Sequence, residues 1–250
     1  MLKANGEGDV TLEEAIYIRK TTRSFDHLPL DDSVLKDIME FGKTLKPLDE
    51  SIKTYFDIVP VGEIKCILPW KPPHFIAIFS EEKEGFLTNV GFMYEQLVLY
   101  LTTLGIGTCW LGMAGFDNSS DVRRYSRLPF VIIIAFGKAK GSPYRDLSEF
   151  RRMPLAEIAD VMDEKLEPAH LAPSSTNKQP WYFVHEGDVF HAYRIVRGST
   201  ERSLYGRINR IDLGCALAHM YAANPDTFKF FVQQHPQKLA GHYYVGSFTV

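Results

Sequence analysis

The sequence is poor in cysteine and has no long apolar run, and these two shortages exclude several classes of protein. Cys66, Cys109 and Cys215 are odd in number and far apart, and they lack the spacing of a metal site. A disulfide framework and a structural zinc site are therefore not expected. The longest apolar run, FVIIIAFG from Phe130, is too short to cross a bilayer, and the start MLKANGEGDV lacks the apolar core of a signal peptide. We expect a cytoplasmic protein without a metal ion or a membrane partner.

The chain also lacks an excess of charge of either sign. Its 28 basic and 31 acidic residues leave a formal net charge of -3, so no global field attracts nucleic acid or an anionic surface. Any anion site must be local. With 250 residues, 45% of them hydrophobic, the chain can bury a full core as one large domain or two small ones.

Apolar residues at helical spacing predict five helices. The first opens with the capping box Thr11-Leu-Glu-Glu14 and ends near Lys20. A long and largely buried helix is expected near 88–104, where Gly105 and Gly107 follow its end. The other three are expected over residues 31–47, 155–166 and 211–223.

Eight segments are predicted as strands, and FVIIIAFG is expected at the centre of a sheet because it is apolar throughout. The strand segments are TYFDIV from 54, HFIAIF from 74, TCWLG from 108, FVIIIAFG from 130, WYFVHE from 181, DVFHAYRIV from 188, FKFFVQQ from 228 and HYYVGSFTV from 242. The order of helices and strands in the second part repeats much of the first. We therefore expect an α+β protein of two similar halves that share an interface like a dimer fused into one chain.

Two basic clusters are candidates for an anion site. Arg19 and Arg23 are one helical turn apart, with Thr21 between them, so together they could grip a phosphate. The alternative is that these cations only complement the dipole at the end of the first helix. The pair Arg151 and Arg152 could neutralise the same anion or belong to a solvated loop.

Two further segments are candidates for ligand contact. Gly105–Gly112, GIGTCWLG, could place backbone N–H groups against a flat ligand, or could be an ordinary helix end followed by a strand. The segment APSSTNKQPW, residues 172–181, gathers turn formers and small hydrogen-bonding groups before a strand.

Familiar catalytic motifs do not fit the sequence. The glycines at 105 and 107 follow a helix instead of a strand, so they do not form a dinucleotide fingerprint. A phosphate-binding Gly-Lys-Ser loop, a Gly-x-Ser-x-Gly elbow and a His-Glu-x-x-His pair are all absent from the sequence. A catalytic Cys109 is disfavoured, because no neighbouring His or cation suggests a lowered pKa.

The combination of Arg-x-Thr-x-Arg, LGIGTCWLG, VIIIAFGKAKG and above all LAPSSTNKQPW resembles the nitroreductase family of FMN enzymes. In ordinary members the APSS-type string follows soon after the arginine motif, whereas here the corresponding residues 47–51 are degenerate and the clear copy comes much later. This resembles a single-chain branch in which two halves, 1–152 and 153–250, imitate the usual homodimer. The resemblance implies a nitroreductase-like fold with a central mixed or antiparallel sheet flanked by helices. It also implies one FMN site built from both halves, with the second, pseudo-symmetric site lost.

The resemblance assigns roles to individual residues. Arg19, Thr21 and Arg23 match phosphate and ribityl contacts, and Arg151 or Arg152 completes the phosphate site. Leu111 and Gly112 fall where the family offers a backbone N–H to flavin N5. The segment that lies along the flavin ring in the family is matched by Pro173, Ser174, Ser175 and Asn177.

The function implied is a ping-pong oxidoreductase in which NADH or NADPH reduces FMN and a small nitroaromatic, quinone or flavin acceptor reoxidises it. Two alternatives remain at this point. One is different chemistry on the same scaffold, such as a dehalogenase or a flavin-fragmenting oxygenase, and the other is a non-catalytic flavin-binding protein. The resemblance implies a monomer with internal pseudo-symmetry, and the sequence leaves further dimerisation open.

Overall fold

The computed structural model describes residues 10–196 and 204–250. The helices in these ranges are α1 (Leu12–Ile18), α2 (Asp32–Gly42), α3 (Phe86–Thr103), α4 (Leu155–Ile158), α5 (Glu167–Leu171) and α6 (Leu204–Ala223). The strands are β1 (Thr54–Val59), β2 (Ile64–Lys65), β3 (His74–Ser80), β4 (Ile106–Leu111), β5 (Gly115–Phe116), β6 (Phe130–Lys138), β7 (Trp181–Glu186), β8 (Val189–Ile195), β9 (Lys229–Phe231) and β10 (His242–Thr249).

The eight predicted strands form two separate four-stranded sheets, and both are antiparallel throughout. Their orders are β1-β3-β6-β4 and β7-β8-β10-β9. Across each sheet, the strands that come first, second, fourth and third along the chain lie side by side in that order. A long helix, α3 or α6, connects the second strand to the third in each case. The FVIIIAFG strand, β6, is an inner strand, as predicted.

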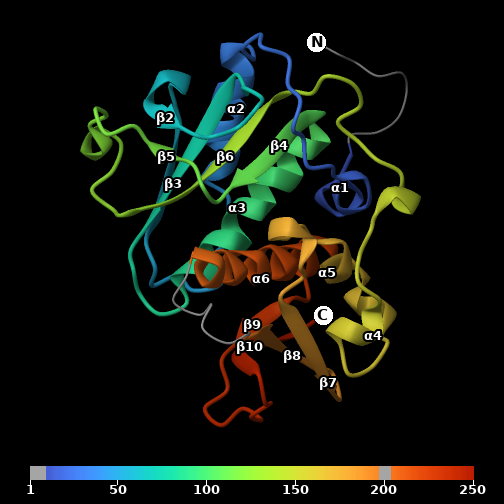
Figure 1. Cartoon of the computed structure of the whole chain (residues 1–250). Coiled ribbons are helices and arrows are strands. Elements are labelled where there is room, and N and C mark those ends of the chain that lie inside the picture. Colours follow the sequence, from blue (N-terminus) through green and yellow to red (C-terminus); the bar gives the residue numbers. More distant parts are fainter. Residues whose placement is uncertain (1–9, 197–203) are drawn as a thin grey trace.

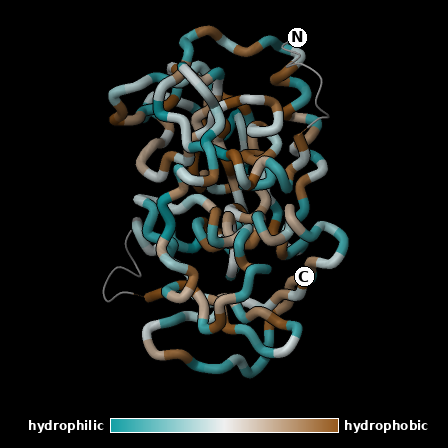
Figure 2. Tube along the Cα trace, turned by 90° about the vertical axis from the view of Figure 1, so that its right-hand side faces the viewer, coloured by the Kyte–Doolittle hydropathy of each residue, from teal (hydrophilic) through white to brown (hydrophobic). Residues whose placement is uncertain are grey.

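The two long helices lie between the two sheets, as Figure 1 shows, and the molecule is longer along this stacking direction than across it (Figure 2). Helix α3 packs on the first sheet and α6 on the second. Each helix also reaches into the other core, because Phe92 of α3 belongs to the α6 cluster, and Ile211 and Cys215 of α6 belong to the α3 cluster. The two cores are thus continuous through the pair of helices.

The crossing of α3 and α6 is reciprocal and very close. A Cβ on Gly91 would lie 2.1 Å from the backbone oxygen of Ile211, and a Cβ on Gly214 would lie 2.1 Å from that of Thr88. Both relations carry the same offset, since 211 − 88 and 214 − 91 each equal 123. When residue i of one half contacts residue j of the other, and the equivalents of i and j make the same contact in reverse, the two halves are related by a two-fold axis. The same offset places Asn89 at the position equivalent to Asp212.

Most of the predicted elements are present, with one clear error. The capping box at Thr11 is formed on both sides, and the long helix predicted at 88–104 runs from 86 to 103. The helix predicted over 155–166 is wrong, because α4 ends at Ile158. Ala159 is extended (φ -148°, ψ 154°) and pairs with Phe183, whose oxygen accepts the N–H of Asp160. Pairing with β7 overrides the local helix pattern here.

Two helix ends also differ from the prediction. Helix α2 stops at Gly42 instead of reaching Pro47. Helix α1 stops at Ile18, so the arginine motif that follows it is not helical. Within the described ranges, no helix is long and apolar enough to cross a membrane.

Candidate active site

A cavity of about 330 Å³ lies between the two halves of the chain. Segments that are far apart in the sequence line it: residues 21–23, 66–70, 109–114, 173–176 and 208–215. Seven predicted site residues are among those that line the cavity: Thr21, Arg23, Leu111, Gly112, Pro173, Ser174 and Ser175. The other four, Arg19, Arg151, Arg152 and Asn177, lie outside its lining.

The arginine motif reaches the cavity through an extended backbone, which corrects the helical-turn argument. Thr21 pairs in parallel with Thr108 of β4, and Arg19 pairs with Tyr144. Alternate residues of an extended chain point the same way, so Arg19, Thr21 and Arg23 still share a side. The Nη1 of Arg19 lies 3.3 Å from the Oγ1 of Thr21.

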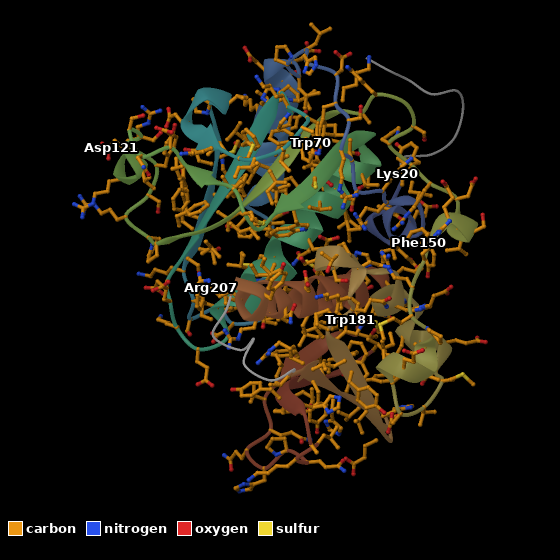
Figure 3. All side chains as sticks on the ribbon, in the orientation of Figure 1. Lys20, Trp70, Asp121, Phe150, Trp181 and Arg207 are labelled. Carbon is orange, nitrogen blue, oxygen red and sulfur yellow. The ribbon has the colours of Figure 1, made fainter. Side chains whose placement is uncertain are left out.

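Arg19 belongs to a cluster of three guanidinium groups behind Thr21. The Nε of Arg145 donates to the backbone oxygen of Arg19 (2.8 Å), while its guanidinium stacks on Phe150. Figure 3 shows Lys20 and Phe150 on the side of the molecule that carries α1. Arg152 donates to the Oδ1 of Asn177 (2.6 Å) and to the oxygen of Leu171 (2.9 Å). Arg145 was not predicted from the sequence.

This cluster carries more positive charge than its protein partners balance. Burial, and then repulsion by Arg19, lower the pKa of Arg152 to about 9 and that of Arg145 to about 10. Two carboxylates offset part of this charge: Glu149 acts on Arg145, and Glu95 of α3 acts on Arg152 and has its Oε1 3.7 Å from the Nε of Arg19. The buried Nε atoms of Arg19 and Arg152 have no hydrogen-bond partner among the described residues. Unpaired buried donors and surplus positive charge fit an anion such as a phosphate.

Glu95 connects this cluster to both halves of the molecule. It is fully buried, and it accepts a hydrogen bond from the indole Nε1 of Trp110 (2.8 Å) on β4. Its other oxygen lies 3.2 Å from the Nε2 of His219 on α6, whose Nδ1 is 3.0 Å from the oxygen of Pro168. Burial lowers the pKa of His219, against the opposing effect of Glu95. A change at Glu95 would therefore disturb Arg19, β4 and α6 together.

The APSSTNKQPW segment forms a strained loop at the opposite wall of the cavity. Thr176, Asn177 and Gln179 have φ of 52°, 56° and 43°, which are costly for residues other than glycine. Hydrogen bonds to neighbouring segments hold this backbone in place. The Oε1 of Gln179 accepts the N–H of Met153 (2.6 Å), and Asn177 bonds to Arg152 and to the oxygen of Arg151. In this structure Asn177 thus ties the loop to the arginine cluster.

The N–H of Ser175 in this loop donates to the Oδ2 of Asp212 on α6 (3.0 Å). Asp212 is buried and lines the cavity, although it was not predicted from the sequence. Its signal was present, because Ile208, Asp212 and Cys215 recur at spacings of four and three on one helical face. A single acid on an otherwise apolar face was overlooked as part of a core helix.

All three cysteines of the sequence also line this cavity, as does Trp70. Burial raises the pKa of the Cys109 thiol, although Arg23 and Arg19 oppose that effect, and burial raises the pKa of Cys66 and Cys215 as well. The thiol form is a poor nucleophile. The sequence argument that no cation neighbours Cys109 is wrong, because Arg23 and Arg19 act on its thiol, and the absence of a catalytic role for Cys109 stays a prediction. Among the described residues, no cluster of His, Cys, Asp and Glu is arranged to hold a metal ion.

A second, larger cavity of about 860 Å³ lies at the equivalent place on the other side of the helix crossing. It is lined by loop 48–50, the start of α3, and strands β9 and β10. The equivalent elements around the first cavity are loop 173–176, α6, β4 and β6. This second cavity is richer in aromatic residues, among them Phe230, Phe231 and Tyr243, and Arg194 and Arg210 also line it. The predicted loss of a second flavin site stays a prediction.

Comparison with known proteins places this arrangement in a family. The family model described as "Putative TM nitroreductase" matches residues 11–224, which include both walls of the cavity. The chain belongs to this nitroreductase family. A search of curated proteins found no match.

Solved structures of nitroreductases are similar to this one. A "putative nitroreductase" from Thermotoga maritima MSB8 has a TM-score of 0.67 at 20% identity, over 99% of this chain and 96% of that one. A nitroreductase family protein from Clostridium novyi NT has a TM-score of 0.41 at 20% identity, over 56% and 90%. A nitroreductase with bound FMN from Desulfitobacterium hafniense DCB-2 has a TM-score of 0.42 at 14% identity, over 57% and 98%. The Thermotoga maritima structure shows that the chain has a nitroreductase fold along nearly its whole length.

Proposed function

We propose that this nitroreductase is an FMN-dependent NAD(P)H oxidoreductase with one flavin site, in the cavity between its halves. The observation that carries the proposal is the buried arginine cluster next to that cavity, in which the Nε atoms of Arg19 and Arg152 form no hydrogen bond with the described residues. FMN has an anionic phosphate, a polar ribityl chain and a flat ring. The lining of the cavity supplies Arg23, hydroxyl groups and an apolar wall, and the arginine cluster lies behind Thr21.

Each part of the cofactor has a complementary region of protein. Arg19 and Arg23 would hold the phosphate, with Arg152 completing its charge balance. Thr21, Ser174 and Ser175 supply short hydroxyl groups for the ribityl chain. The ring would lie against Gly112 at the end of β4, an edge strand of its sheet.

When bound, FMN supplies two-electron chemistry between a nicotinamide and an acceptor. The protein's task is binding and orientation. Leu68 and Trp70 form an apolar wall that would exclude water from the ring, and Pro173 fixes the entry of the strained loop. Because residues on both sides of position 152 line the cavity, the proposed site needs no second copy of the chain.

The direct test removes the phosphate contacts. The double change Arg19→Ala and Arg23→Ala should release FMN, because two charge-assisted hydrogen bonds contribute roughly 1.5–3 kcal/mol each, or at least a hundredfold in Kd. Exposed Arg23→Glu tests the same site without disturbing the buried Glu95 pair. Exposed Arg123→Ala, outside the lining of this cavity, is the matched control.

Flavin absorbance of the purified protein measures binding, and circular dichroism checks that each variant is folded. Anaerobic NADH or NADPH should bleach the flavin of the native protein. Flavin retained by the folded double variant would refute the phosphate assignment. A yellow protein that neither nicotinamide reduces would support the non-catalytic alternative instead.

A further inference from the structure

Asp212 places a carboxyl group in the wall of the proposed flavin cavity. It lies on α6 with 6% of its surface exposed, and the same cavity is lined by Leu111 and Gly112 of the opposite wall. One of its oxygens, Oδ2, accepts the N–H of Ser175 at 3.0 Å. No hydrogen bond to its Oδ1 is formed by the described side chains around it.

The other half of the molecule shows whether a carboxyl group is needed to hold such a loop on the helix. Asn89 of α3 is the equivalent residue by the offset of 123, and its Oδ1 accepts the N–H groups of Leu48 (2.8 Å) and Asp49 (3.2 Å). Those two residues follow Pro47 as Ser174 and Ser175 follow Pro173. An amide oxygen is therefore sufficient to hold this type of loop on the helix. The ionisable group at 212 is not required for that task.

The surroundings of Asp212 favour its protonated form. Burial raises the pKa of Asp212 to about 8, the hydrogen bond from Ser175 opposes this, and Glu95 of α3 raises it further. The neighbouring ionisable groups are Cys215 on α6, Cys66 and Cys109 across the cavity, and the cation Arg23 in its lining. Burial raises the pKa of all three thiols, so they contribute no compensating charge near neutral pH.

We propose that Asp212 is the proton donor to the electron acceptor that is reduced in this cavity. The inference rests on the proposed function. An acceptor with a quinone-type carbonyl takes two electrons and one proton as a hydride, and a second proton must reach its other oxygen to give the hydroquinone. The O–H bond of Asp212 breaks, the new O–H bond forms on the acceptor, and the carboxylate regains a proton from water.

The kinetic test separates the two half-reactions of Asp212→Asn. Asn89 shows that an amide can hold the loop, so the variant should fold, bind FMN and be reduced by NAD(P)H within about twofold of the native rate. Transfer to a quinone acceptor at pH 7 should be slower by at least about tenfold, given the roughly 10²–10⁴-fold typical of general acids. The native rate of this step should fall as pH rises through about 8, and the variant should lose that dependence. Asn89→Asp is the matched control and should leave both half-reactions unchanged.

A second readout needs no activity. A carboxyl with a folded pKa of about 8 and an ordinary value of 3.8 releases its proton more readily in the unfolded chain between these pH values. Its contribution therefore makes stability fall as pH rises from about 4 to 8, by up to about tenfold in the folding equilibrium constant per pH unit. Urea unfolding should show this slope in the native protein and its loss in Asp212→Asn.

The outcomes separate the two proposals. If neither nicotinamide reduces the native flavin, the proposed function fails and the donor role fails with it. If reduction occurs but the acceptor step of Asp212→Asn equals the native step at every pH, the donor role alone is refuted. An unfolding slope that is the same in both proteins would likewise refute a protonated Asp212.

Discussion

The close crossing of α3 and α6 makes Gly214→Ala a sharp test of the architecture. The added Cβ would meet the Thr88 oxygen at 2.1 Å, the Phe92 nitrogen at 2.7 Å and the Gly91 Cα at 2.9 Å. These are backbone atoms, so no side-chain rotation can relieve the overlap. Restoring an ordinary 3.4 Å contact requires a shift of about 1.3 Å, the difference between 3.4 and 2.1 Å. A gap of that size forfeits at least about a quarter to a half of each contact energy along the crossing.

The expected loss follows from two opposing effects. Overpacking costs about 1–3 kcal/mol and occasionally more, and three backbone overlaps at a shared core favour the upper end, about 3–5 kcal/mol. Alanine regains about 1 kcal/mol of helix propensity over glycine. The net destabilisation is therefore about 2–4 kcal/mol, or roughly 4–16 °C in Tm for a chain of this size.

Urea unfolding and calorimetry measure this change, and Gly62→Ala is the control. Gly62 has no heavy atom within 4 Å of an added Cβ, so its substitution should be neutral or slightly stabilising. The double variant with Gly91→Ala should lose less than the sum of the two single losses, because one separation of the helices accommodates both methyl groups. A Gly214→Ala variant within about 0.5 kcal/mol of the native protein would refute the close crossing.

Three further changes test the surroundings of the site. Burial lowers the pKa of His219 below its ordinary 6.5, so the unfolded chain binds the proton more readily and stability should fall as pH drops below about 6.5. His219→Gln should reduce this loss of stability when urea unfolding at pH 5 and pH 7 is compared. An unchanged loss would count against a buried, neutral His219. Trp110→Phe removes the only indole donor that we find for Glu95 among the described residues. Urea unfolding should show that the free energy of unfolding falls by about 1–3 kcal/mol. A neutral result would contradict the buried hydrogen-bond network of Glu95. Thr11→Ala removes both the hydroxyl acceptor and the capping box of α1. Thermal unfolding should show a loss of stability of about 1 kcal/mol. Glu13→Gln, at an exposed neighbouring position, is the control and should show no such loss.

The elements could be predicted where local pattern and tertiary packing agree. The apolar repeat of α3 and the continuous run of β6 are buried in a way that their residue types already require. The segment after Pro154 has an equally good helical pattern, but Ala159 and Asp160 are drawn into pairing with β7. A local pattern contains no information about that distant partner.

The candidate site shows the same division. Arg23 and Ser175 carry a sequence motif, so their meeting in one cavity could be anticipated from a resemblance. The roles of Arg145 and Asp212 depend on tertiary contacts. Arg145 donates to the backbone oxygen of Arg19, and Asp212 of α6 accepts the N–H of Ser175. Spacing places Asp212 on one helical face with Ile208 and Cys215, but it does not identify the loop that the face contacts.

The equivalence of positions 89 and 212 has a consequence for how the two cavities can change. In an assembly of identical subunits, one codon specifies both copies of a residue, and any substitution alters two sites at once. Here each position has its own codon. Asn89 can serve a loop beside an aromatic cavity while Asp212 serves a loop beside the arginine cluster, and a mutation in one cavity leaves the sequence of the other intact. Covalent continuity thus frees a symmetric scaffold from having symmetric chemistry.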